Sequence, residues 1–324
     1  MTAEWRAVLR DKFRELAEGF IASRDRRRGL PWLHAEFQRR TGRELHLRNP
    51  VTMDEKIQWR KVNVRNPLYP VMSDKLRMRD QVRKRLGADE TRDLFPRLLG
   101  ESAHPTADWL AGFGDSIAIK ANHGSGWNAF VQKGETPDWE ELARLTRHWM
   151  RRSYGLQKQE WAYWSIPRRI LVEELLCGPD GTFPLDFKFE VFDGKVRCIQ
   201  VERNTGGIML ARFLPDWTPL PIPDNPHESL DGLPRPADLP RMLALAERIA
   251  AGMDYLRVDF LRSADRLVLN ELTVYRVSGF GKPSPPEMSD WLGSLWRNPA
   301  WPDHSGEADR WLAQILACDA ERAA

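Results

Sequence analysis

The sequence predicts an α+β protein in which antiparallel strands alternate with helices. A chain of 324 residues is long enough for two or three lobes with sizeable cores. Short runs typical of strands are joined by glycine-containing turns, and Asp193-Gly194 between two of them is a strong hairpin signal. Segments with helical spacing of apolar residues lie before and between these runs. Many antiparallel strands interrupted by helices indicate the α+β class.

The bulk composition is that of an ordinary globular enzyme. A net charge of +3 from 49 basic and 46 acidic residues is too nearly balanced to predict nucleic-acid binding. No apolar run is long enough for a transmembrane helix, and the N-terminus lacks the pattern of a secretory signal. Cys177, Cys198 and Cys318 lack metal-ligand spacing and indicate reduced thiols, so we expect a cytoplasmic protein. The 14 tryptophans suit packing, although stacking on a sugar or lipid-linked headgroup, and a peripheral membrane association, stay open.

The N-terminal third is predicted to be helical. Apolar residues recur at helical spacing from Ala3 to about Phe37, with a second short helix after Pro31. Thr52 is placed to cap the next helix, and Glu55 completes a capping box. A further helix follows from residue 74 to residue 87.

The pattern changes at residue 116, where strands begin. A glycine loop joins the first two strands, and a Pro-, Asp- and Gly-rich stretch over 215–240 is expected to be a long loop. The predicted strands cover residues 116–121, 128–133, 169–175, 185–192, 195–202, 255–261 and 266–272, and the predicted helices cover residues 138–152 and 239–252.

The loop Lys120-Ala-Asn-His-Gly-Ser-Gly-Trp-Asn128 is the first candidate for chemistry. Gly124 and Gly126 let backbone N–H groups turn towards an anion, and Lys120 at the end of a strand can reach a phosphate oxygen. The spacing is neither that of a P-loop nor that of a dinucleotide-binding helix. Taken alone, the loop fits a phosphate flap and a plain tight turn equally well. His123 is more simply a hydrogen-bonding partner of the loop or nucleotide than a general base.

Two carboxylates on the last strands are the second candidate. If these strands form one hairpin around residues 263–265, Asp259 and Glu271 can face the same side. Two such oxygen donors, completed by nucleotide phosphates, suit Mg²⁺. Arg257 projects to the same face and could neutralise charge in a phosphoryl or acyl transition state. Solvent-facing strand residues are the plainer interpretation of this pair taken alone.

A third segment could bind a nucleotide base. The strand end around Glu173, Glu174, Leu175 and Leu176 offers backbone groups and carboxylates to an adenine edge and a ribose. Lys188 alternates with apolar Phe187 and Phe189 and is either an exposed strand lysine or a second phosphate contact.

Several motifs follow one another in order between about residues 49 and 282. They are Asn49-Pro-Val-Thr-Met-Asp-Glu-Lys-Ile-Gln-Trp-Arg60, Asn66-Pro-Leu-Tyr-Pro70 with Asp74-Lys75, the Lys120–Asn128 loop, Trp161-Ala-Tyr163, Val172-Glu-Glu174, Asp186-Phe-Lys-Phe189, Arg257-Val-Asp-Phe260, Asn270-Glu-Leu-Thr-Val-Tyr275 and Ser278-Gly-Phe-Gly281. The series resembles the ATP-grasp superfamily and, more narrowly, the TupA-like ATP-grasp proteins named for teichuronopeptide biosynthesis. Matched motifs in one order are far more specific than any one of them.

The resemblance implies an ATP-grasp fold in which two α+β lobes with antiparallel sheets clasp ATP. It suggests a helical region over 1–110, a small lobe with the flap over 111–176, and a large lobe with the Mg²⁺ site and C-terminal helices over 177–324. It also implies a role for each matched residue. These are phosphate contacts from Lys75, Lys120, Lys188 and the flap residues His123, Gly124, Ser125 and Gly126; adenine contacts around Glu173, Glu174, Leu175 and Leu176; a ribose contact from Asp180; Mg²⁺ ligands Asp259, Glu271 and Thr273; catalysis by Arg257 with Lys120 and Lys188; and substrate contacts from Arg257, Ser278 and Gly279.

The chain departs from the family pattern at two places. Thr273 stands where the superfamily usually has a metal-binding Asn, which puts a second Mg²⁺ in doubt. Arg276-Val277 stands where Pro-Gly-like residues are expected, which affects the acceptor pocket.

The activity implied by the resemblance is carboxylate–amine ligation through an acyl phosphate. ATP and Mg²⁺ are the expected cofactors. An amino acid, a uronic acid or a carrier-linked intermediate would be the substrate, in cell-surface polysaccharide, peptide-polymer or specialised-metabolite synthesis. A kinase that phosphorylates a hydroxyl and a glycosyltransferase remain alternatives, although Asp259 lacks the partner of a D-x-D metal motif. The sequence does not indicate the oligomeric state.

Overall fold

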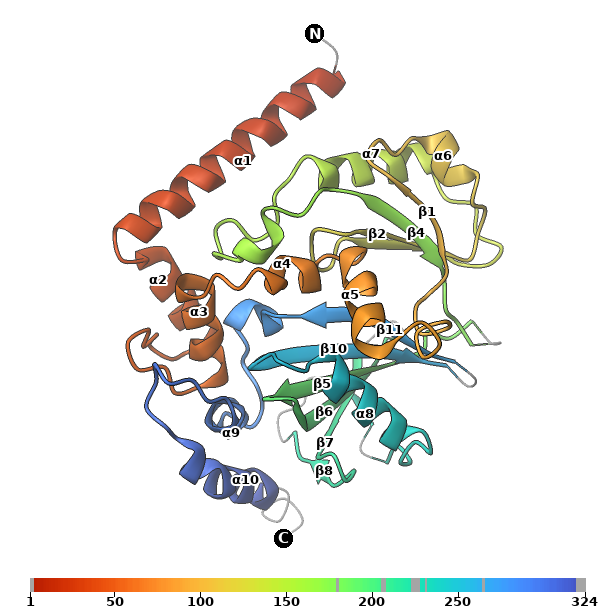
Figure 1. The fold of residues 1–324 in the computed structure, drawn as a ribbon. Helices are drawn as coiled ribbons and strands as arrows, with labels where there is room; N and C mark the ends of the chain where they lie inside the picture. The colour runs from red at the N-terminus through yellow and green to blue at the C-terminus, as the bar shows by residue number, and fades with distance from the viewer. Residues whose placement is uncertain are drawn as a thin grey trace.

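The computed structural model describes residues 3–178, 181–204, 208–222, 228–230, 232–263 and 266–318. Helices α1 to α5 come first, and two sheets follow that lie one above the other in Figure 1. The predicted α+β class is confirmed. The α-helices are α1 (Ala3–Arg27), α2 (Pro31–Thr41), α3 (Met53–Asn63), α4 (Leu68–Ser73), α5 (Arg77–Leu86), α6 (Ala107–Ala111), α7 (Trp139–Met150), α8 (Leu239–Ile249), α9 (Glu287–Leu295) and α10 (Ala308–Ala317).

The smaller sheet is antiparallel, with strand order β1-β4-β2-β3. Its buried side chains include Ile117 and Val172, which form one core with Ala143 and Trp149 of α7. The strand β1, which was not predicted, pairs with β4 although it lies before residue 111. The strands are β1 (Leu98–Ser102), β2 (Ile117–Ala121), β3 (Asn128–Val131) and β4 (Ile170–Glu174).

The larger sheet runs β11-β10-β5-β6-β7-β8, and β9 adds to β7 in parallel. The predicted pairing of the last two long strands is confirmed. Within the long loop expected over 215–240, two short strands, β8 and β9, pair with β7. The strands are β5 (Leu185–Phe192), β6 (Lys195–Asn204), β7 (Ile208–Phe213), β8 (Pro219–Leu220), β9 (Glu228–Ser229), β10 (Tyr255–Arg262) and β11 (Leu267–Thr273).

Helix α3 is buried on nearly all sides although most of its residues are polar. The predicted capping box is present, because Thr52 Oγ1 accepts from the Glu55 N–H and Glu55 Oε2 accepts from the Thr52 N–H. Further along, Lys56 Nζ donates to the carbonyls of Gly293 and Trp296, at 2.8 Å each. These bonds satisfy buried polar groups on both partners, so α3 ties the C-terminal segments to the rest of the molecule.

Candidate active site

Lys120, at the end of β2, connects the two lobes. Its ammonium lies 2.9 Å from Glu173 Oε2 on the adjacent strand β4 and 3.0 Å from Asn270 Oδ1 on β11 of the larger sheet. Glu173 also accepts from Arg79 Nη2 of α5 at 2.5 Å. Burial raises the pKa of Glu173, but the charges of Lys120 and Arg79 outweigh burial and hold that pKa below its usual value. The Glu173 carboxylate therefore holds two cations.

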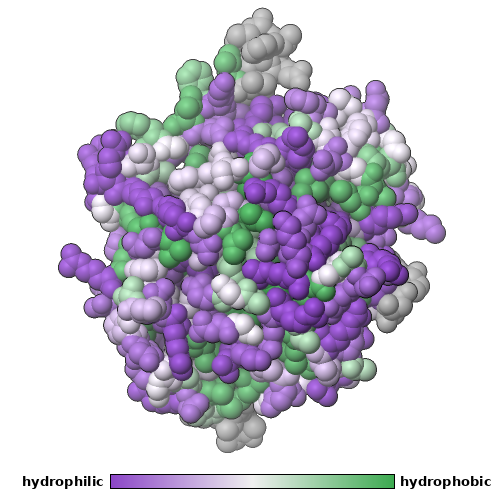
Figure 2. All heavy atoms as spheres, in the orientation of Figure 1, coloured by the Kyte–Doolittle hydropathy of each residue, from purple (hydrophilic) through white to green (hydrophobic). Residues whose placement is uncertain are grey.

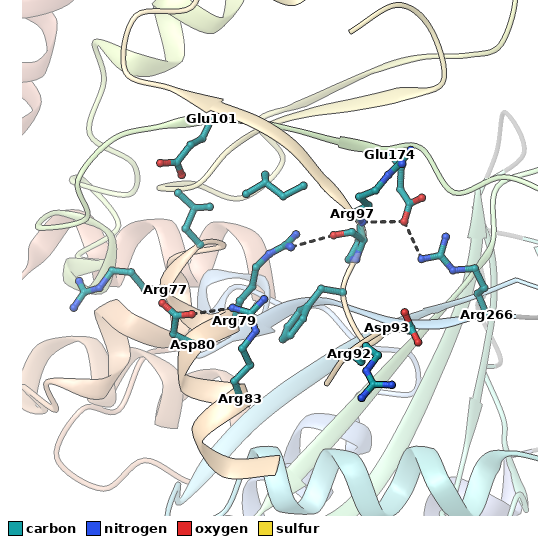
Figure 3. A pocket seen from close by; sticks show the side chains of 14 residues that line it. Arg77, Arg79, Asp80, Arg83, Arg92, Asp93, Arg97, Glu101, Glu174 and Arg266 are labelled. Atoms are coloured by element: carbon teal, nitrogen blue, oxygen red, sulfur yellow. Dashed lines mark hydrogen bonds and ion pairs between the residues drawn. The ribbon is translucent and has the colours of Figure 1, made fainter. Parts of the chain in front are cut away.

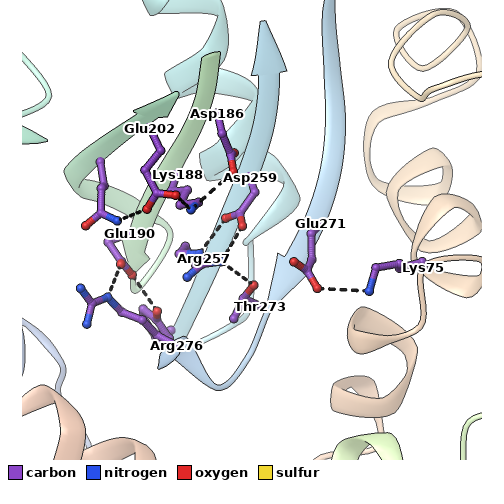
Figure 4. Close-up of polar contacts among 12 residues, drawn as sticks. Lys75, Asp186, Lys188, Glu190, Glu202, Arg257, Asp259, Glu271, Thr273 and Arg276 are labelled. Atoms are coloured by element: carbon purple, nitrogen blue, oxygen red, sulfur yellow. Dashed lines mark hydrogen bonds and ion pairs between the residues drawn. The ribbon is translucent and has the colours of Figure 1, made fainter. Parts of the chain in front are cut away.

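Lys75, just before α5, makes a similar connection. Its ammonium lies 3.3 Å from Glu271 Oε1 on β11 and donates to the Gly124 carbonyl at 2.6 Å. Figure 4 shows Lys75 reaching Glu271 from the helical side of the site. Burial raises the pKa of Glu271, but the charges of Lys75 and Arg257 lower this pKa by more than burial raises it. Glu271 therefore stays ionised. The glycine loop and the last strand thus share one lysine.

The two predicted metal-binding carboxylates are direct neighbours. Asp259 on β10 pairs in register with Glu271 on β11, and both were predicted to face one side. Arg257 grips Asp259 with two hydrogen bonds of 2.8 and 2.6 Å and donates to Thr273 Oγ1 at 3.1 Å (Figure 4). The Thr273 hydroxyl therefore acts as a hydrogen-bond acceptor for Arg257.

A β-bulge brings Asn270 into the site. The pairing shifts after Asp259, because Glu271 opposes Asp259 whereas Leu269 opposes Phe260. Asn270 is the extra residue, and a bulge re-aims the side chains around it. Neighbouring Asn270 and Glu271 consequently reach two lysines, Lys120 and Lys75. Sequence reasoning assigned no role to Asn270.

Lys188 on β5 pairs in register with Asp259 and lies between two further carboxylates. It forms ion pairs with Glu202, and with Asp186 at 3.4 Å. Burial lowers the pKa of Lys188, but the charges of Asp186 and Glu202 more than reverse this effect and keep it protonated. Its alternation with buried Phe187 and Phe189 is confirmed. Lys188 is largely buried, so the alternative of an exposed strand lysine is wrong.

The flap divides into a packed base and an exposed tip. Gly124 is buried, and a Cβ there would come within 2.8 Å of the Trp127 ring, so only glycine fits. Ser125 and Gly126 are exposed at the tip. His123 is buried beneath, with its ring nitrogens 3.1 Å from Asn122 Oδ1 and from the Trp149 carbonyl. Both nitrogens of His123 are therefore engaged within the protein, one with the loop residue Asn122 and the other with the carbonyl of Trp149 on α7.

A pocket of about 340 Å³ lies where the two sheets face each other. Leu175, Leu176 and Phe130 give it apolar walls, and Lys120 and Asn270 are among its polar lining residues. Its size and its mixed apolar and polar lining suit a nucleobase.

Glu174 lines both this pocket and the neighbouring one drawn in Figure 3, where its side chain accepts from Arg266 at 2.8 Å and from the Arg97 N–H at 2.9 Å. The carboxylates of Glu173 and Glu174 are both engaged with protein partners, and the Leu175 N–H donates to the Ser116 carbonyl at 2.7 Å. Asp180, predicted to contact ribose, lies outside the described residues.

The segment predicted to meet the acyl phosphate forms a left-handed turn. Val277, Ser278 and Gly279 have φ values of 47°, 54° and 62°. Lys61 Nζ donates to the Ser278 carbonyl at 2.9 Å, and Ser278 Oγ donates to Glu160 at 3.1 Å. Non-glycine residues in this region cost energy and tend to occur where surrounding structure enforces them, often at functional sites.

Arg276, at the first position where Pro-Gly-like residues were expected, is buried. Its guanidinium lies 2.7 Å from Glu190 on β5 (Figure 4). The positive charge is thus neutralised within the large lobe. Sequence reasoning missed Glu190, although a glutamate among the apolar residues of a strand was the available signal.

The TupA-like ATPgrasp family profile matches residues 55–297, three quarters of the chain. The chain belongs to the TupA-like ATP-grasp family. The expected ATP-grasp fold therefore holds, and residues 1–54 lie outside the matched region. No curated protein sequence matches the chain.

Solved structures similar to this TupA-like ATP-grasp protein are distant. D-alanine–D-alanine ligase from Bacillus anthracis is 17% identical, with a TM-score of 0.38 over 78% of this chain and 69% of the ligase. The ATP-grasp ligase PsnB, solved with a precursor variant, Mg and ADP, is 15% identical, with a TM-score of 0.39 over 77% of this chain. This chain spans 60% of PsnB. The macrocyclase MdnC from Microcystis aeruginosa is 12% identical, with a TM-score of 0.37 over 75% of this chain and 68% of MdnC.

Proposed function

We propose that this TupA-like ATP-grasp protein is an ATP- and Mg²⁺-dependent carboxylate–amine ligase. The observation that carries the proposal is that three cations lie around the carboxylate pair beside a nucleobase-sized pocket: Lys75 contacts Glu271, Arg257 contacts Asp259, and Lys120 contacts Asn270, the neighbour of Glu271. The cations come from separate segments and meet where the two lobes face each other. Such an arrangement suits a polyphosphate laid from the pocket towards Asp259 and Glu271.

The chemistry proceeds in two steps. A substrate carboxylate oxygen attacks the γ-phosphorus of ATP, the bond to ADP breaks, and an acyl phosphate forms. An amine then attacks the acyl carbon, the tetrahedral intermediate expels phosphate, and the nitrogen loses a proton. Lys75 and Lys120 position the phosphates, while Arg257 offsets charge that develops on the transferring group and on the intermediate. The flap tip at Ser125 and Gly126 would close over the phosphates.

The carboxylate pair fits one Mg²⁺. Asp259 and Glu271 are in register on neighbouring strands and would supply two hard oxygen donors to one ion, with Arg257 bonded to both oxygens of Asp259. When bound, Mg²⁺ neutralises phosphate charge. The Thr273 hydroxyl accepts from Arg257 and is the weaker candidate for a third ligand.

The substrate would carry a carboxylate near the turn at Ser278 and Gly279. From the family likeness we propose an amino acid, a uronic acid or a carrier-linked intermediate in polysaccharide, peptide-polymer or specialised-metabolite synthesis. Buried Lys61 and Glu160 hold this turn and would fix its backbone against the substrate.

Turnover assays test the reaction class. The protein is incubated with ATP, Mg²⁺ and pooled amino acids and uronic acids. Ligation predicts ADP and phosphate only when both a carboxylate and an amine are present, and hydroxylamine should trap the acyl phosphate as a hydroxamate. ADP with a stable phosphorylated product would instead indicate a kinase. Release of UDP from a nucleotide sugar without ATP consumption would rule out the proposal.

Substitutions test the site. Lys120→Ala and Glu271→Gln should each reduce ATP turnover by about 100-fold or more, since each group acts on developing charge. Arg79 still pairs with Glu173 in Lys120→Ala, so circular dichroism should show a folded protein. Lys195→Ala, at an exposed lysine paired with Glu247, is the matched control and should keep full turnover. Full activity in both site variants would refute the assignment.

A further inference from the structure

Helix α1 carries an apolar stripe that faces away from the protein. Leu9, Phe13, Leu16 and Phe20 follow helical spacing, and the last three are 69%, 64% and 62% exposed. The helix extends along the upper left of the molecule in Figure 1, and hydrophobic residues appear there on the surface in Figure 2. Phe and Leu side chains with this much exposure in one row mark an interaction surface.

The opposite side of α1 is acidic and is held on the small lobe. Asp11 accepts from Arg151 at 2.8 Å, and Glu15 accepts from Arg168 at 2.6 Å. Glu18 lies 3.2 Å from Arg152. These ion pairs fix the rotation of the helix about its axis, so the apolar stripe is directed outward by the same contacts that attach α1.

This orientation segregates charge as well as apolarity. Residues 9–28 contain four carboxylates, and all four are turned inward: Asp11 and Asp25 are buried, and Glu15 and Glu18 are half-buried. The exposed cations Lys12, Arg24 and Arg27 lie on the same side of the helix as the stripe. Lys12 precedes Leu16 by four residues, and Arg24 and Arg27 follow Phe20 by four and seven residues, which are helical spacings. The outward face over residues 9–28 therefore combines apolar side chains with positive charge alone.

We propose that the outward face of α1 binds the surface of an anionic lipid bilayer. Phe13, Leu16 and Phe20 would enter the boundary between headgroups and acyl chains, while the flanking cations contact lipid phosphates. The helix has 25 residues, or roughly 37 Å, and would lie in the plane of the surface. No helix within the described residues is both long and apolar enough to cross the bilayer.

The charge pattern favours lipid over a second copy of the chain. Parallel pairing of two α1 stripes would place each cation beside its own equivalent. Antiparallel pairing would place Arg24 and Arg27 near the partner helix's Lys12. Both arrangements bring like charges together around the apolar contact, which is unfavourable, whereas anionic headgroups complement them.

Vesicle flotation tests the proposal with the full chain. The protein should float with phosphatidylglycerol–phosphatidylcholine vesicles, bind phosphatidylcholine vesicles at least about tenfold more weakly, and detach as salt is raised. Phe13→Ser combined with Phe20→Ser should reduce binding at least about tenfold, and so should Arg24→Glu combined with Arg27→Glu. Leu316→Ser, at a 39% exposed leucine on α10, is the matched control and should bind like the wild type.

Circular dichroism and ATP turnover of each variant check that folding and the active site are intact, because the stripe lies apart from both sheets. Equal flotation of the Phe13→Ser/Phe20→Ser variant would overturn the proposal, as would failure of the wild type to bind anionic vesicles. A dimer in sedimentation velocity that this variant abolishes, without vesicle binding, would assign the stripe to a second copy. These outcomes are independent of the ligase chemistry.

Discussion

Each lysine predicted to hold phosphate has a carboxylate partner inside the protein. Lys75 pairs with Glu271, Lys120 with Glu173, and Lys188 with Glu202. A buried ammonium without a partner would carry a desolvation cost of several kcal/mol, so these pairs keep the lysines charged and in position. Bound phosphates would join an already ordered set of cations, which is the preorganisation that phosphoryl transfer requires.

His123 illustrates how burial at the base of the flap affects stability. Burial lowers its pKa from 6.5 to about 4. Between these values the unfolded chain binds a proton that the folded chain does not, so the free energy of unfolding falls as the pH is lowered, by roughly 3 kcal/mol in total. Urea denaturation at several pH values should show this slope. His123→Gln should flatten this slope, and an unchanged slope in that variant would contradict the assignment.

Among the elements, those with a regular pattern were predictable. Strand β5 matches the predicted residues 185–192, because its buried apolar residues are bounded by clear turns. The bulge at Asn270 was not predicted, since one extra residue leaves no mark in the apolar pattern. The burial of α3 was also missed, because Lys56 and Lys61 are residue types that normally face solvent.

The turn at residues 277–279 depends on its contact with α3, and Gly279→Ala tests that contact. Gly279 has φ +62°, and a Cβ would come within 2.7 Å of Ile57 Cγ2 and 2.9 Å of Gln58 Nε2. Left-handed strain and overpacking together should lower the free energy of unfolding by about 2–4 kcal/mol. Gly134 has φ +81°, and an added Cβ there would have no atom within 4 Å. Gly134→Ala therefore introduces backbone strain without overpacking and should lower the free energy of unfolding by about 1 kcal/mol. Equal losses in urea denaturation would mean that the packing against α3 is unimportant.

At the scale of the whole molecule, β11 is the strand of the large lobe that contacts the rest of the chain around the site. Asn270 and Glu271 contact Lys120 and Lys75, and the Leu269 N–H donates to the Leu94 carbonyl at 2.6 Å. The family likeness predicted that ATP lies between the lobes. It could not predict that the lobes are joined by direct lysine contacts, because those depend on side chains brought together from residues about 150–200 apart in sequence.

Nucleotide binding at this junction should stabilise the whole chain in a way that depends on Mg²⁺. A ligand at 100 times its Kd adds about 2.7 kcal/mol, which raises the Tm of a protein of this size by a few degrees. In differential scanning fluorimetry, ATP with Mg²⁺ should raise the Tm more than ATP alone, because Asp259 and Glu271 offer oxygen donors to the ion. Glu271→Gln should lose the Mg²⁺-dependent part and keep a shift with ATP alone, whereas exposed Glu101→Gln should behave like the wild type. An undiminished Mg²⁺ effect in Glu271→Gln would place the ion elsewhere.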